Sequence, residues 1–285
     1  MSDIQVEELL QEISADAPCG NDLEYDLAFG EMERAAEGKP EQQFGDTLVP
    51  AEDPDWKDLK RKASVLLSRT KDYRVVVYLA RAMLHTDGLP GFRDCLQLLC
   101  GYTDRYWDTA HPQLDPDDDN DPTLRVNTLA TLCDREATLQ YLRKVPLVSS
   151  RAIGQFGLLD VEIARGEVSG GAGEEHPELS TIEAAFLDAD VASLQETAQA
   201  AREALASTKT LETSLTEKVG VANAVSFEDL THMLQQVEKV LTEQLSRRGV
   251  ASGGEGDAGA EGEGSGVEGS HGDGATTGGG PAEVT

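Results

Sequence analysis

The chain has 285 residues, 39% of them hydrophobic, and a formal net charge of −29. This length is sufficient for one or two domains with buried cores. The acidic excess argues against nucleic acids and anionic membranes as partners, because their phosphates would be repelled. The sequence contains no run of about 18 apolar residues, the length that a transmembrane helix requires. Its acidic, amphipathic start also lacks the features of a signal peptide, so we expect a cytoplasmic protein.

The N-terminal part of the chain carries apolar residues at helical spacing, and this pattern predicts a helical bundle. A helix is expected over 55–70, with Asp55 as a suitable N-cap. The next helix, over 73–84, is apolar on nearly every side at its centre, which is typical of the central helix of a bundle. We expect a turn at 88–91 and a further helix over 92–107.

A long helix is expected from 124 to 142, followed by a small hairpin or an irregular turn between 145 and 165. The segment 166–177 is rich in Gly, Ser and Glu and is interpreted as a linker. Residues 178–249 predict a short helix and a long helical hairpin, with Gly220 between its two arms. The apolar stripes of this hairpin predict packing in the core, and a coiled coil with a partner is the alternative.

The last 36 residues, 250–285, hold 13 of the 28 glycines, seven acids and no Lys or Arg. Such a segment cannot bury enough apolar area to offset chain entropy, so we expect it to be disordered. The predicted fold class is therefore mainly α: a helical-bundle domain at 1–165, a linker at 166–177, a small helical-hairpin domain at 178–249 and a disordered Gly- and acid-rich tail.

The sequence shows no recognised catalytic or cofactor motif. No GxSxG elbow, HExxH or GxxxxGK[ST] occurs, and the five histidines are scattered. The four cysteines form no CxxC pair, and three of them lie in apolar helical patterns, where a free thiol behaves as a small hydrophobe. We therefore predict no enzyme activity, no metal site and no cofactor. A disulfide, a zinc site or a cysteine–histidine catalytic pair are the alternatives.

The most acidic stretch packs five aspartates into seven residues: Asp115, Asp117, Asp118, Asp119 and Asp121. An EF-hand loop would need a glycine at its sixth position and a glutamate at its twelfth. Counted from Asp115, these positions hold Asn120 and Val126. We therefore expect solvated aspartates rather than a calcium site or a catalytic carboxylate pair. Asp121 is suited to cap a helix that begins with Pro122.

Five collinear motifs in the first 165 residues resemble one known family. They are PCGNDLEYDLAF (18–29), GKPEQQFGDTLVPAEDPDWKDL (38–59), LLSRTKDYRVVVYLARAML (66–84), GLPGFRDCLQLL (88–99) and RYWDTAHPQLDPDDDNDPTLR (105–125). In their length and order they are similar to the ImpA-related N-terminal domain of TssA proteins, which are components of the bacterial type VI secretion system.

The resemblance implies a non-enzymatic assembly protein at the cytoplasmic, inner-membrane-associated base of the secretion machine. Members of this family are associated with the baseplate, the sheath, the inner tube and the membrane complex, and they help to coordinate sheath and tube growth. The implied partners are other type VI secretion proteins and no nucleic acid. A function from another class is the alternative: an acidic helical adaptor or chaperone that holds a basic client. An acid-rich hydrolase is the third possibility.

The resemblance also singles out motif residues for which we expect a structural role. They are Trp56, Asp72, Arg74, Trp107, His111, Pro112, Asp121 and Arg125. Trp56 and Trp107 are expected to anchor the core, and Arg74 or Arg125 to pair with acids in this neighbourhood. The loop from Trp107 to Pro122 would join two helices, and an exposed partner-binding loop is the alternative.

Family members carry a C-terminal domain, variable among subgroups, that assembles into rings. Here the helical hairpin leads directly into the Gly-rich segment, as expected of a fragment ending in an interdomain linker or of an unusually short member. The body alone has a net charge of −22, which is −29 without the seven acids of the tail. Because such copies repel each other at low salt, we expect a monomer, or at most a weak dimer formed through the hairpin at 190–248.

Overall fold

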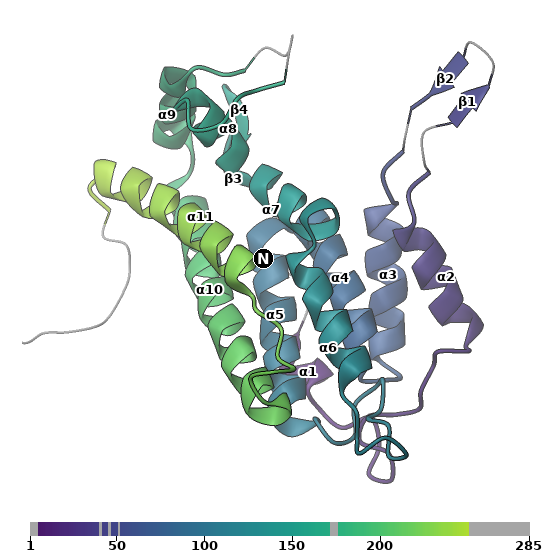
Figure 1. Ribbon diagram of the computed structural model, residues 1–285. Coiled ribbons are helices and arrows are strands. Elements are labelled where there is room, and N and C mark those ends of the chain that lie inside the picture. Colours follow the sequence, from purple (N-terminus) through teal and green to yellow (C-terminus); the bar gives the residue numbers. More distant parts are fainter. Residues whose placement is uncertain (1–4, 40–41, 45–46, 51, 172–175, 251–285) are drawn as a thin grey trace, which may run out of the picture. The chain divides into compact units, whose positions relative to one another are not determined.

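The protein is mainly helical (Figure 1). The computed structural model describes residues 5–39, 42–44, 47–50, 52–171 and 176–250, all of which belong to one compact unit. The helices are α1 (Val6–Leu9), α2 (Leu27–Ala36), α3 (Trp56–Leu67), α4 (Tyr73–Thr86), α5 (Gly88–Arg105), α6 (Thr123–Ala130), α7 (Gln140–Lys144), α8 (Leu158–Ala164), α9 (Leu179–Asp188), α10 (Val191–Val219) and α11 (Glu228–Arg247). None of these helices is long and apolar enough to cross a membrane.

Two short antiparallel strand pairs accompany the helices. They are β1 (Gln42–Phe44) with β2 (Thr47–Val49), and β3 (Pro146–Ser150) with β4 (Gly154–Gly157). The second pair is the hairpin expected between 145 and 165, and it leads directly into α8. It begins where α7 ends and contacts α9 and α10, so it connects the bundle to the C-terminal helices.

Helix α4 lies at the centre of the bundle, between α3 and α5 (Figure 1). Nine of its residues are buried, as the apolar run at its centre predicts. Aspartate side chains set the start of both α3 and α4. The Asp55 carboxylate accepts from the N–H of Asp58 at 3.0 Å, and the Asp72 carboxylate accepts from the N–H of Arg74 at 2.8 Å. Each cap satisfies a backbone donor that has no partner inside its helix.

Helix α10 packs along α5, and α11 packs on α10 (Figure 1). The α10 stripe of Ala201, Ala204, Leu211 and Leu215 is fully buried. The Cys100 thiol of α5 also donates to the Ser207 carbonyl of α10 at 3.2 Å. The prediction of core packing for this stripe is therefore confirmed. A dimer formed through the hairpin stays a prediction, and it would have to use a surface other than this stripe, because α5 and α11 already cover the stripe.

The packing of α10 on α5 also bears on the boundary predicted at 166–177. The structure places 178–249 in the same compact unit as the first 165 residues. An amphipathic helix has the same sequence pattern whether it packs inside its own domain or against another one, so periodicity could not reveal this contact. The separate domains expected at 1–165 and 178–249 are tested by unfolding, and the packing of α10 on α5 favours one cooperative unit instead. The segments 172–175 and 251–285, within the predicted linker and tail, lie outside the described residues.

The helix expected over 124–142 is interrupted. After α6 the chain forms a 3₁₀ turn (Thr131–Cys133) and a π-helical turn (Arg135–Leu139) before α7. Between the two turns, Asp134 has an extended backbone, and its carboxylate accepts from the N–H groups of Glu136 and Ala137 at 2.9 and 2.7 Å. The apolar spacing continues across Asp134 and therefore predicts one helix. Asp134 nevertheless interrupts this helix, because its side chain caps a new helical segment.

Three boundaries differ from the expectation by a few residues. The segment 88–91 is the first turn of α5 rather than a separate turn, and Pro90 fits there because an N–H in the first turn needs no helical partner. Helix α5 ends at Arg105, slightly before the expected end. Helix α6 begins at Thr123 rather than Pro122, and the Asp121 carboxylate accepts from the Thr123 hydroxyl at 2.7 Å.

We predict that Leu211→Ala destabilises the whole described unit by about 2–5 kcal/mol, because it leaves a cavity in the α5–α10 interface. Denaturant unfolding followed by tryptophan fluorescence tests this, because Trp56 and Trp107 both lie outside the C-terminal helices. The control Glu217→Ala, at an exposed position of α10, should change the free energy of unfolding by less than about 0.5 kcal/mol. Two separate transitions, with the tryptophan signal unaffected by Leu211→Ala, would contradict the single unit.

Candidate functional site

Three motif segments meet at one end of α4, at a place that we call the motif junction (residues 19–24, 70–74, 107–112 and Arg125). Backbone hydrogen bonds join the segments. The N–H of Lys71 donates to the Cys19 carbonyl at 2.8 Å, and the N–H of Tyr73 donates to the His111 carbonyl at 2.9 Å. The N–H of His111 donates back to the Lys71 carbonyl at 2.9 Å. The chain thus forms a small sheet-like contact between residues far apart in the sequence.

Arg74 connects the junction to the N-terminal segment. Its guanidinium contacts three carboxylates, those of Asp72 at 2.7 Å, Glu24 at 2.8 Å and Asp22 at 3.2 Å. Asp72 is fully buried, so the Arg74 guanidinium compensates a carboxylate charge that water cannot reach. The guanidinium also lies 4.9 Å from the centre of the Phe29 ring. The acids that pair with Arg74 therefore come from its own helix cap and from residues 22–24, not from the aspartate run.

Arg125, on α6, is 1% exposed and contacts no carboxylate among the described residues. Its guanidinium donates instead to three backbone carbonyls, those of Pro112 at 2.6 Å, Ala110 at 2.5 Å and Trp107. The cation lies over the Trp107 and Tyr73 rings, at 5.0 and 5.6 Å from their centres. Burial lowers the pKa of Arg125. The carbonyls and the ring faces therefore take the place of a counter-ion.

Lys71 is a junction residue that the sequence analysis did not single out. It is fully buried, and its ammonium donates to the Leu9 carbonyl at 2.8 Å and to the Gln11 carbonyl. The Tyr106 ring centre lies 5.0 Å from the same nitrogen. Burial lowers the pKa of Lys71. A lysine beside an aspartate in the segment RTKDYR gives no signal of burial, because the same pattern is common at exposed helix starts.

His111 and Pro112 also belong to the junction, and the peptide bond between them is cis. The His111 ring is 3% exposed, with Nε2 3.2 Å from the Gly20 carbonyl and Nδ1 3.8 Å from the Asp22 carboxylate. Asp121 lies apart, at the start of α6. The junction thus brings together Asp72, Arg74, Trp107, His111, Pro112 and Arg125 from the predicted set, whereas Trp56 and Asp121 lie elsewhere.

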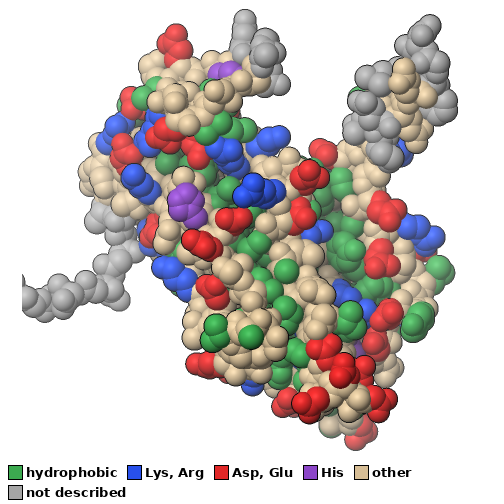
Figure 2. All heavy atoms as spheres, in the orientation of Figure 1, with side chains coloured by type: hydrophobic (Ala, Val, Ile, Leu, Met, Phe, Trp, Pro, Cys, Tyr) green, Lys and Arg blue, Asp and Glu red, His purple; other side chains and the backbone are tan. Residues whose placement is uncertain are grey.

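The aspartate run forms an exposed loop before α6. The Asp115 carboxylate accepts from the N–H of Asp117 at 2.9 Å, and the N–H of Asp121 donates to the Asp118 carbonyl at 3.0 Å. Figure 2 shows acidic side chains gathered over this end of the molecule. Among the described residues, no group of three or more His, Cys, Asp or Glu side chains has the geometry to hold a metal ion. The backbone of the loop closes on itself, because the N–H of Asp115 donates to the Asp121 carbonyl at 3.4 Å.

Trp56 is half-buried at the edge of the core rather than inside it. Its ring stacks on His85, with centroids 3.8 Å apart and planes 7° from parallel, and the Tyr141 ring meets both edge-on. Burial lowers the pKa of His85 to about 4, with Asp53 opposing the shift. Trp56 thus packs against the core, but it is half-buried and lines a small cavity instead of lying inside the core.

The four cysteines are free. Burial raises the pKa of all four thiols, to about 11 for Cys100 and further for Cys95. A thiol at neutral pH is a poor nucleophile and a poor metal ligand. The Cys19 sulfur contacts the Thr109 hydroxyl at 3.2 Å. Cys95 is fully buried in the core, as expected for a small packing residue.

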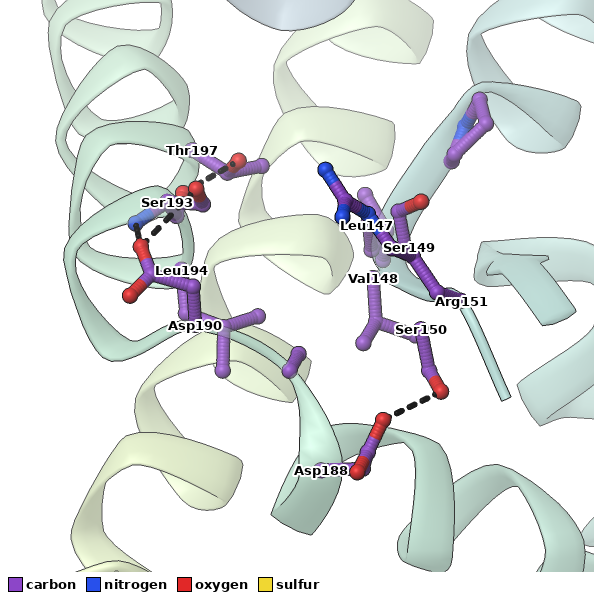
Figure 3. Close-up of a pocket in the computed structure, with 12 residues that line it drawn as sticks. Leu147, Val148, Ser149, Ser150, Arg151, Asp188, Asp190, Ser193, Leu194 and Thr197 are labelled. Carbon is purple, nitrogen blue, oxygen red and sulfur yellow. Dashed lines mark hydrogen bonds between the residues drawn. The ribbon is translucent and has the colours of Figure 1, made fainter. Parts of the chain in front are cut away.

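A cavity of about 480 Å³ lies between β3 and the start of α10 (Figure 3). Its carboxylates are already engaged. Asp188 accepts from the Ser150 hydroxyl at 2.6 Å, and Asp190 caps α10 by accepting from the N–H of Ser193 at 2.8 Å. Arg151 lines the same cavity. These groups form a turn and a helix cap, and they include no nucleophile paired with a base.

We predict that Arg125→Met destabilises the protein by at least about 3 kcal/mol, because three buried carbonyls lose a charged donor. Denaturant unfolding at neutral pH measures the change. Arg105→Met, at an exposed position near the end of α5, is the matched control and should leave the free energy of unfolding within about 0.5 kcal/mol of the wild type. Equal effects of the two substitutions would show that Arg125 does not hold the junction.

We predict that His85 makes the protein less stable in mild acid. Its pKa of about 4 in the folded state lies below the usual value near 6.5, so the unfolded state binds more protons between these pH values. Stability should therefore fall as the pH drops through this window. The difference in unfolding free energy between wild type and His85→Gln should change by about 1–2 kcal/mol between pH 7 and pH 5. The control Gln113→Asn, at an exposed position, changes no titratable group and should leave the pH dependence as in the wild type. A pH dependence that is the same in His85→Gln and wild type would refute the assignment.

Comparisons with known proteins cover most of the chain. Residues 10–134, which contain all eight motif residues, match the family model of the N-terminal region of ImpA, type VI secretion system. The type VI secretion system component TssA1 of Pseudomonas aeruginosa is 41% identical over 240 residues, which cover 84% of this chain and 68% of that protein.

A solved structure has the same fold. It is the N-terminal domain, including the conserved ImpA_N region, of the TssA component of the type VI secretion system from Burkholderia cenocepacia. It aligns with a TM-score of 0.70 and 26% identity, and the alignment covers 88% of this chain and 97% of that one. With sequence identity and fold in agreement over most of its length, the chain belongs to the TssA family and is a type VI secretion system component.

Proposed function

We propose that this protein is a non-enzymatic assembly component of the type VI secretion system, which helps to build the baseplate and the sheath and tube through protein–protein contacts. The observation that carries the proposal is the relationship to TssA1 over most of the chain. We propose a cytoplasmic location at the inner-membrane-associated base of the apparatus. The proposed partners are other type VI secretion proteins of the baseplate, sheath, tube and membrane complex.

The contacts that the motif residues make support a structural role. The charged and polar side chains of the junction contact one another, backbone carbonyls or aromatic rings. The thiols have raised pKa values, and His85 is held in its neutral form against Trp56. The motifs thus stabilise one arrangement of α4, α5 and α6, which is what a rigid scaffold for binding surfaces requires.

The proposed oligomeric state of this chain is a monomer, or a weak dimer at most. The stripe of α10 that would have been the most apolar contact surface is buried inside the chain. A stable interface would need on the order of 1,600 Å² of buried surface with a desolvated centre. The net charge of −29 also opposes association of identical copies at low salt.

We predict that the full chain, carrying an affinity tag and cross-linked in a bacterium with an active type VI secretion system, captures baseplate and sheath proteins. The reason is that an assembly component contacts several parts of the machine. Quantitative mass spectrometry of the captured proteins provides the measurement. A matched strain that lacks the secretion genes is the control. Recovery of one basic client in both strains would contradict the proposal and support an acidic adaptor.

A further inference from the structure

A small cavity of about 220 Å³, which we call the Trp56 pocket, lies between the end of α2, the start of α3, α4 and the π-helical turn before α7. Its walls are mainly apolar and aromatic, formed by Leu59, Ala137 and the rings of Trp56 and Tyr141. Those two rings meet edge-on at 5.6 Å, and the His85 ring stacks on the Trp56 ring. Stacked and packed rings of this kind give the pocket rigid walls.

Arg81, from α4, also lines the Trp56 pocket. Its guanidinium donates to the Thr131 carbonyl at 3.2 Å, and its Nε is buried without a hydrogen-bond partner. Within the described part of the chain, no carboxylate forms an ion pair with it. Burial lowers the pKa of Arg81, with Tyr78 and Asp134 opposing the shift. Burying an incompletely paired cation is costly, so such a site favours an anion.

The other arginines around the core show what is missing at Arg81. Arg74 has three carboxylates, and Arg125 has three carbonyls and two ring faces. The acid that acts on Arg81, Asp134, already accepts two backbone N–H groups as a helix cap. Glu136 lines the pocket too, but its side chain is exposed. The carboxylate of a ligand could thus pair with the Arg81 guanidinium, as the Asp72 carboxylate pairs with that of Arg74.

We propose that the Trp56 pocket binds a single carboxylate that carries a small apolar or aromatic body. The carboxylate pairs with the Arg81 guanidinium, and the body packs against the Trp56 and Tyr141 rings, which line the pocket. Charge-assisted pairing with a guanidinium is directional and strong where water is excluded. The volume suits one amino-acid side chain or a small organic acid. The exposed Glu136 at this pocket disfavours ligands with several negative charges.

The test is a titration of the full chain with benzoate, followed by tryptophan fluorescence and calorimetry. Benzamide, which has the same shape and no charge, is the ligand control. We expect saturable quenching and one site per chain with benzoate only. Arg81→Met should weaken binding by at least about tenfold, and Arg105→Met, an exposed control, should bind as the wild type does. Benzoate should raise the melting temperature of the wild type and not that of Arg81→Met.

A second arm distinguishes a free acid from an acidic residue of a protein. The probe is the peptide acetyl-Ala-Leu-Glu-Leu-Ala-amide, with glutamine in place of glutamate as its control. Binding of either the peptide or benzoate through Arg81 supports the proposal and identifies the source. The proposal would be overturned if charged and uncharged probes bound equally well, or if Arg81→Met bound the acids with unchanged affinity. It would also be overturned if neither benzoate nor the glutamate peptide showed saturable binding.

Among the described residues that line the pocket, Glu136 carries the one carboxylate that could compete for Arg81. Under the proposal, Glu136→Gln leaves the melting temperature of the free protein unchanged and strengthens benzoate binding, because it removes a negative charge from the pocket. Arg81→Met should melt no lower than the wild type, because it removes a charge that forms no ion pair with any described carboxylate. A marked loss of stability in Glu136→Gln would identify Glu136 as the resident partner of Arg81 and would also overturn the proposal.

Discussion

The buried guanidinium of Arg125 holds the bundle together at one end. It reaches from α6 to carbonyls in the segment that follows α5, where carbonyls are no longer paired inside a helix. That segment in turn carries His111, whose backbone pairs on both sides of Asp72. Asp72 caps α4 and compensates Arg74, which fixes residues 22–24. One cation thus links α6, the end of α5, the start of α4 and the N-terminal segment.

These contacts explain why charged residues occupy the motifs of a protein with a structural role. A buried Arg or Lys specifies one arrangement, because its donors must all be satisfied, whereas apolar side chains tolerate several packings. Arg125, Lys71 and Arg74 each satisfy this condition in a different way, through carbonyls, rings or carboxylates. Arg81 does not satisfy this condition, because its buried Nε has no hydrogen-bond partner. The same requirement for satisfied donors therefore favours a ligand in the Trp56 pocket, which Arg81 lines.

The sequence predicted the elements better than their contacts. The apolar faces of α3 to α5 and the cap at Asp55 follow local rules, and the structure shows them. The cap expected at Asp121 is wrong, because Pro122 takes the N-cap position of α6 and Asp121 bonds the Thr123 hydroxyl instead. The sequence analysis did not predict the break at Asp134, because the apolar spacing on both sides of this residue indicates one continuous helix. The pairing of Arg74 with residues 50 positions away and the carbonyl partners of Arg125 depend on irregular backbone that no pattern encodes. The pocket beside Trp56 was missed for the same reason.

Backbone hydrogen exchange of the full chain tests most directly whether the motif junction is part of the cooperative core. The amides of Tyr73 and His111 donate to carbonyls across the junction. If the junction holds the bundle, these two amides exchange as slowly as those at the centre of α4, such as Leu79, because all of them open only in global unfolding. Exchange at Tyr73 and His111 that is orders of magnitude faster than at Leu79 would contradict this account.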